Sequence, residues 1–82
     1  MTENRFYALI SRTTPTLVEF YATWCGPCRE MQTILEDLER TMRTRADVIR
    51  IDTDSPENGN LTRQHHIMSV PTFILYREGR VM

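Results

Sequence analysis

The stretch that decides the fold is Val-Glu-Phe-Tyr-Ala-Thr-Trp-Cys-Gly-Pro-Cys-Arg, residues 18–29. Its first half belongs to a short, nearly continuous apolar run, residues 16–21, which is typical of a strand covered on both faces. From Pro27 to Met42 apolar side chains recur at helical spacing between charged ones, and proline is well tolerated in a first helical turn. We therefore expect a strand that leads directly into the N-terminus of a long helix.

The flanking segments complete an α/β pattern. Val48, Ile49 and Ile51 predict a second strand, and a strand, a helix and a strand within this length form a βαβ unit with parallel strands. We expect a short amphipathic helix at residues 3–12 and a capped helix at 56–65, then a strand at 72–77. Without repeats or a low-complexity linker, residues 1–82 are expected to form a single domain.

The composition excludes several classes of function. Apolar residues make up 40% of the 82 residues and charged residues 26%, as in a soluble globular protein. The net charge of −1 gives no electrostatic reason to bind nucleic acid. The apolar runs are too short to cross a bilayer, and the first residues contain no uninterrupted apolar stretch of a secretory signal. We therefore expect a cytoplasmic protein that binds neither nucleic acid nor membrane. A mature chain whose signal had been removed would look the same and is the alternative.

Cys25 and Cys28 are the residues that point to chemistry. Cys25 falls at the expected helix N-terminus, where unpaired N–H groups and the helix dipole stabilise a thiolate and lower the pKa of a thiol. Cys28 lies one turn further on and is close enough to form a disulfide with Cys25. We interpret Gly26 as allowing a tight turn, Pro27 as fixing the helix start, and Trp24 as an apolar platform beside the exposed sulfur.

Other interpretations of the cysteine pair are weaker. A structural disulfide across two intervening residues closes too small a loop to stabilise the fold much. A zinc site needs four ligands, and the adjacent His65 and His66 would point apart on a helix, so we expect neither a metal nor a cofactor. An inert reduced pair is also less favoured, because a C-x-x-C between a strand and a helix is typical of redox motifs.

Residues 18–29 resemble the active-site stretch of thioredoxins, and Ser-Val-Pro-Thr-Phe, residues 69–73, resembles their second signature. The resemblance covers essentially the whole chain and implies the thioredoxin fold, a mixed sheet flanked by helices. It implies that Cys25 is the nucleophile and Cys28 the resolving thiol. It also implies that Pro71 is a cis-proline beside the pair, and that the backbone of Val70 is exposed to the substrate chain.

Glu19 departs from the family pattern, because thioredoxins usually carry a buried aspartate at this place. We expect Glu19 to be buried and to act as the base that takes the proton of Cys28. An edge position turned to solvent is the alternative for such a lone acid. Arg50 matches a lysine that neighbours the buried acid in thioredoxins. It either approaches Glu19 or is a side chain of the strand without a specific role.

The largest departure is at the C-terminal end. Thioredoxins continue past the turn at residues 78–80 with an edge strand and a last helix, so we expect this fold to be incomplete there. The sheet would then keep a bare apolar face, which in a soluble monomer is a liability or an interface. We expect either that the natural protein is longer or that the chain dimerises through this uncovered face.

The expected function is that of a general protein disulfide reductase. The resemblance implies disulfide-containing protein substrates and an electron donor such as a thioredoxin reductase. Between the cysteines, Gly26 and Pro27 resemble the reducing rather than the oxidising members. The alternative is a non-catalytic interaction module with vestigial cysteines, which the presence of both cysteines argues against.

Overall fold

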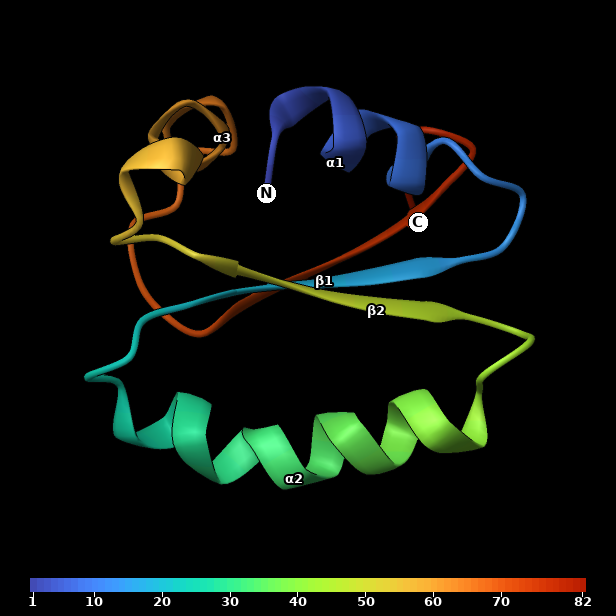
Figure 1. Ribbon diagram of the computed structural model, residues 1–82, viewed down its shortest axis with the longest axis horizontal. Coiled ribbons are helices and arrows are strands. Elements are labelled where there is room, and N and C mark those ends of the chain that lie inside the picture. Colours follow the sequence, from blue (N-terminus) through green and yellow to red (C-terminus); the bar gives the residue numbers. More distant parts are fainter.

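The computed structural model describes residues 1–82 as a four-stranded sheet between two helical layers (Figure 1). The helices are α1 (Glu3–Ile10), α2 (Gly26–Thr41) and α3 (Gly59–Gln64), and a short 3-10 turn, η1 (Pro56–Asn58), precedes α3. The strands are β1 (Thr16–Tyr21), β2 (Asp47–Asp52), β3 (Thr72–Arg77) and β4 (Arg80–Val81).

The sheet has the strand order β2-β1-β3-β4. β1 and β2 are parallel, as the predicted βαβ unit requires, whereas β3 pairs antiparallel with both β1 and β4. The register places Glu19 of β1 between Arg50 of β2 and Phe73 of β3. β1 is thus the inner strand from which α2 begins, and β2 forms one edge of the sheet.

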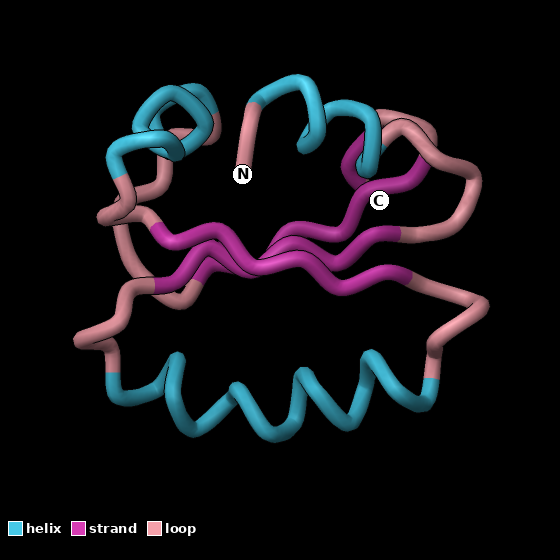
Figure 2. Tube along the Cα trace, viewed as in Figure 1, coloured by secondary structure: helices cyan, strands magenta, loops and turns pink.

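Most of the core lies on one face of this sheet, where α1 and α3 pack (Figure 2). Alternate residues of β1 point to this face, as expected for a pleated strand. Burial raises the pKa of the Tyr76 phenol above its ordinary value, and the neighbouring Tyr7 adds to the shift. The buried side chains of this core are Phe6, Ile10, Val18, Phe20, Ile51, Leu61 and Tyr76.

The opposite face is covered by α2 alone and is thinly packed. Only Cys28 and Leu35 of α2 are buried, and Phe73 and Leu75 of β3 remain 38% exposed. An apolar hollow of about 330 Å³ runs between Leu38 and Leu75. The predicted bare apolar surface is therefore confirmed, whereas a second copy on this face stays a prediction. None of the helices combines the length and the apolar character needed to span a membrane.

The elements differ from the expected ones at three places. The first helix, α1, ends at Ile10 instead of residue 12, and the edge strand expected to be missing is present in part as the two-residue β4. The segment predicted as one helix at 56–65 is split into η1 and α3, and the chain leaves α3 at His66, whose φ is 52°. Such a residue commonly terminates a helix by adopting the left-handed conformation. His65 does not simply decorate the helix end, because its ring lies 5.2 Å from the ring of Phe6 and 5.4 Å from that of Phe20.

Two adjacent aromatic residues of α1 test this account of the core. Phe6 is fully buried and Tyr7 is 42% exposed. Phe6→Ala should lower the free energy of unfolding by about 3–5 kcal/mol, because it leaves a cavity between the helices and the sheet. Tyr7→Ala should cost about 1 kcal/mol or less. Urea denaturation measures both, and equal losses would contradict this placement of the core.

Candidate active site

The cysteine pair lies where β1 leads into α2. Cys25 is the N-cap of α2, and its Sγ atom accepts a hydrogen bond from the backbone N–H of Cys28 at 3.1 Å. The two sulfurs form a disulfide, with 5.2 Å between the Cα atoms. The same N–H group and the helix dipole are placed to stabilise a thiolate on Cys25 once the disulfide is reduced. The predicted position of the pair at a helix N-terminus is confirmed.

The burial of the pair differs from the sequence-based expectation. Residues Cys25 and Cys28 are only 3% and 1% exposed, so solvent access hardly distinguishes them in the oxidised state. They pack with Ala22, and with the half-buried Tyr21 and Val70, in a small apolar cluster. The two cysteines therefore differ mainly in their position relative to the helix N-terminus, because only Cys25 caps α2.

Gly26 and Pro27 form the first turn of α2. Pro27 stands in the first turn, as predicted from its missing N–H. The predicted reason for Gly26 was wrong, because its φ is not positive and a Cβ atom there would meet no atom within 4 Å. The absent side chain instead leaves open space next to the disulfide.

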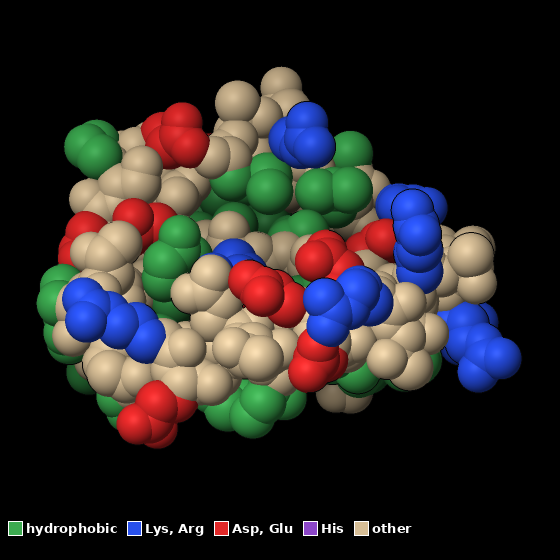
Figure 3. All heavy atoms as spheres, turned by 60° about the horizontal axis from the view of Figure 1, so that its bottom comes forward, with side chains coloured by type: hydrophobic (Ala, Val, Ile, Leu, Met, Phe, Trp, Pro, Cys, Tyr) green, Lys and Arg blue, Asp and Glu red, His purple; other side chains and the backbone are tan.

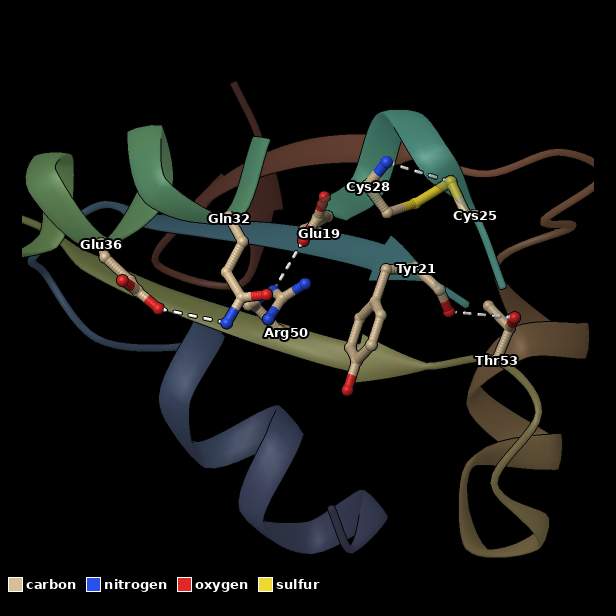
Figure 4. A network of polar contacts seen from close by, with 8 residues as sticks. All are labelled: Glu19, Tyr21, Cys25, Cys28, Gln32, Glu36, Arg50 and Thr53. Carbon is tan, nitrogen blue, oxygen red and sulfur yellow. Dashed lines mark hydrogen bonds and ion pairs between the residues drawn. A yellow bond between two sulfur atoms is a disulfide. The ribbon is translucent and has the colours of Figure 1, made fainter. Parts of the chain in front are cut away.

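Glu19 lies beneath the start of α2 and is completely buried (Figure 4). Its Oε1 atom accepts a hydrogen bond from Nε of Arg50 at 2.8 Å. The guanidinium of Arg50 also covers the ring of Tyr21, with 4.2 Å from Cζ to the ring centroid. The predicted burial of Glu19 is confirmed, and of the two roles considered for Arg50 the structure shows the ion pair.

The second carboxylate oxygen of Glu19 has no partner. Oε2 is buried and makes no hydrogen bond with any other group. Buried polar atoms are nearly always paired, so such an atom requires a reason. A groove of about 250 Å³, lined by Cys28, Arg50 and Gln32 among others, reaches this region from the surface. A carboxylate with one unpaired oxygen thus lies near Cys28 (Figure 4).

Trp24 directly precedes Cys25 in the chain, and a hydrogen bond holds its indole. Its indole is 68% exposed, yet its Nε1–H donates to Oδ2 of Asp54 at 2.8 Å. The backbone N–H of Asp54 in turn donates to Oδ1 of Asp52 at 2.9 Å. Sequence reasoning missed Asp54, because only the fold brings the loop after β2 next to Trp24. The acidic residues before Ser55 were the available signal.

Val70 and Pro71 approach the disulfide from the loop before β3. The Val70–Pro71 peptide bond is cis, and the side chain of Val70 packs against the cluster of Ala22, Cys25 and Cys28. The hydroxyl of Thr72 donates to the carbonyl of Ser69 at 2.6 Å and closes this loop. The structure thus brings the second sequence signature to the first.

Comparison with known proteins identifies the family of this chain. The family model described as Thioredoxin matches residues 1–82. The chain belongs to the thioredoxin family. It is 40% identical over 80 residues to the thioredoxin of Alicyclobacillus acidocaldarius, an alignment that covers 98% of this chain and 74% of the relative. With the bifunctional thioredoxin reductase/thioredoxin of Mycobacterium leprae it shares 36% identity over 81 residues, 98% of this chain and 17% of the relative.

Solved thioredoxins share the fold. The thioredoxin of Plasmodium falciparum superposes with a TM-score of 0.87 and 32% sequence identity, over 99% of this chain and 76% of the other. Deadhead, a germline-specific thioredoxin of Drosophila melanogaster, superposes with a TM-score of 0.85 and 35% identity, over 99% and 77%. As a thioredoxin with a disulfide between Cys25 and Cys28, the chain is a thiol–disulfide oxidoreductase.

A double-mutant cycle tests the buried ion pair. Arg50→Met should lower the free energy of unfolding by about 3 kcal/mol near neutral pH, because it leaves the Glu19 carboxylate buried without a counter-charge. Glu19→Gln in the Arg50→Met background should recover most of this loss. Thermal or urea unfolding of the four proteins gives the coupling energy. Additive effects of the two substitutions would show that the pair contributes nothing as a pair.

Proposed function

We propose that this thioredoxin is a general reductase of protein disulfides. The observation that carries the proposal is the N-cap hydrogen bond, in which Sγ of Cys25 accepts the N–H of Cys28. An anionic sulfur at this position is stabilised in the reduced protein, which provides a nucleophile near neutral pH. Gly26 and Pro27 between the cysteines resemble the reducing members of the family.

The reaction consists of two exchange steps. The Cys25 thiolate attacks one sulfur of the substrate disulfide, forms a mixed disulfide with it and releases the other substrate sulfur as a thiolate. The Cys28 thiol then loses its proton and attacks Sγ of Cys25, which releases the second substrate thiolate. Two electrons pass to the substrate, and the disulfide between Cys25 and Cys28 is left.

Glu19 is proposed as the group that takes the proton of Cys28. The unpartnered Oε2 atom supplies an acceptor, and the ion pair on Oε1 holds the carboxylate in place. The groove beside Cys28 is wide enough for a water molecule that bridges a carboxylate and a thiol. Glu19 is thus placed to assist the second exchange step without contacting the substrate.

The substrate chain is proposed to lie across the surface around the disulfide. Val70, next to Pro71, packs against the pair, open space lies at Gly26 beside Pro27, and the exposed indole of Trp24 belongs to the residue before Cys25. Exposed apolar side chains suit unfolded or extended protein segments, whose disulfides are accessible. Little side-chain specificity is needed when the reacting group is the disulfide itself, which suits a general reductase.

The proposed electron donor is a thioredoxin reductase, and the proposed compartment is the cytoplasm. The Mycobacterium leprae relative, a bifunctional thioredoxin reductase/thioredoxin, supports a reductase as the donor. A protein reductant requires a compartment in which its own disulfide is reduced again after each turnover, as cytosolic thiol systems provide.

Cysteine variants test the reductase activity and the two roles. With dithiothreitol as the electron source, the wild-type protein should reduce the disulfides of insulin, and Cys25→Ser should abolish turnover. Cys28→Ser should instead accumulate a mixed disulfide with the substrate on Cys25, which mass spectrometry detects. A wild-type protein without turnover would support a docking module, and a mixed disulfide on Cys28 in Cys25→Ser would reverse the assignment.

Glu19→Gln tests the proposed base. It should slow the resolution of the mixed disulfide roughly 10²-fold, because proton transfer to a positioned base typically contributes at least this much. The first attack by Cys25 should change little. Single-turnover trapping with acid quench separates the two steps. If both steps slow equally, or if neither does, Glu19 does not act as the base.

A further inference from the structure

The outer edge of β2 leaves main-chain groups free. The amides of Asp47 and Thr53 donate to carbonyls of residues 15 and 21, so odd-numbered residues of β2 face β1. The main chains of Val48, Arg50 and Asp52 therefore point away from the sheet. The carbonyl of Asp52 accepts from Nδ2 of Asn58 at 3.0 Å, so the free groups are the N–H of Asp52 and the N–H and C=O groups of Val48 and Arg50.

Nothing in β2 blocks this edge. Natural edge strands are usually protected by proline, a bulge or a charged side chain that stands in the path of another strand. β2 contains no proline, and its register with β1 is uninterrupted. The guanidinium of Arg50 is folded back onto Glu19 and Tyr21 and does not obstruct the approach.

A groove between the two helical layers exposes the same edge. Its volume is about 350 Å³, and its lining comes from α1, the end of α2, the loop that follows α2 and the start of β2. Figure 3 shows apolar side chains at the floor of a hollow in this face and charged side chains around it. Leu9, Val48 and Ile49 provide apolar lining, and Arg5, Glu39 and Arg43 provide charges.

We propose that two copies of this chain associate through antiparallel pairing of their β2 strands. With Ile49 on the two-fold axis, Val48 of each copy faces Arg50 of the second copy. Each such pair exchanges two main-chain hydrogen bonds, so the four free groups of Val48 and Arg50 in one strand are matched by those in the other. The two Ile49 side chains become a close non-hydrogen-bonded pair on the α1 face.

The charges at the two ends of β2 fit this antiparallel arrangement. Arg43 and Arg45, which make no ion pair, precede the strand, whereas Asp52 and Asp54 lie at its end. Antiparallel pairing brings the basic end of one strand to the acidic end of the other. Parallel pairing of the two β2 strands would instead place like charges opposite each other. The second copy is therefore favoured over an unrelated extended peptide as the occupant of this edge.

Sedimentation equilibrium of the oxidised 82-residue chain tests the association. The mass should rise with protein concentration toward twice 9.7 kDa. Val48→Pro removes an N–H that β1 does not use, and should weaken dimerisation roughly 10- to 100-fold. Val48→Thr, which keeps the N–H, is the matched control and should dimerise like the wild type. Insulin reduction by Val48→Pro should remain unchanged, so that this test is separate from the redox function.

A cross-link tests the register independently of the proline variant. In a Cys25→Ser/Cys28→Ser background, Ile49→Cys should form an intermolecular disulfide, because the two positions face each other on the axis. Asp47→Cys, on the same strand and face, should not. A monomer at all concentrations, equal cross-linking of the two variants, or a dimer that survives Val48→Pro would each overturn the proposal. The last outcome would place the contact on the bare sheet face beside α2.

Discussion

The N-cap of α2 is the constraint on which the site depends. A helix start leaves N–H groups without partners, and here one of them is satisfied by the sulfur of Cys25 instead of a hydroxyl or carboxylate. The sulfur can occupy this position because β1 ends one short turn earlier and directs the chain into the helix. In the oxidised protein this hydrogen bond caps the helix, and in the reduced protein it stabilises a thiolate on Cys25.

The second constraint is the buried charge under α2. Glu19 lies in the middle of the inner strand, where desolvation of a carboxylate is costly. Arg50 offsets this cost from the neighbouring strand and is itself held by the ring of Tyr21. The parallel register of β1 and β2 sets this contact. The crossover through α2 makes the two strands parallel neighbours and so brings the Glu19 carboxylate to the Arg50 guanidinium. A sheet with another strand order would leave Glu19 without its counter-charge.

Local sequence patterns predicted several elements of the fold and part of the candidate site. The bounds of β1 and the helix start expected at Pro27, which the structure places at Gly26, follow from local patterns that tertiary structure did not override. The burial of Glu19 was expected from the resemblance to thioredoxins, which also offered the approach of Arg50 as one of two roles. No local pattern decided between those roles, because the ion pair depends on the register of β1 and β2. The contact between Trp24 and Asp54, and the place of His65 among core rings, depend on loops that meet only in three dimensions.

The two faces of the sheet have different roles. The α1 and α3 face contains nearly all of the large buried side chains and supplies most of the stability, whereas the α2 face contains the disulfide and the ion pair. Arg50 links this chemistry to the edge of the sheet. Because its side chain turns inward to Glu19, it does not shield the main chain of β2 from another strand. A residue that holds the proposed base in place therefore also leaves the edge open, and association and proton transfer would share one side chain.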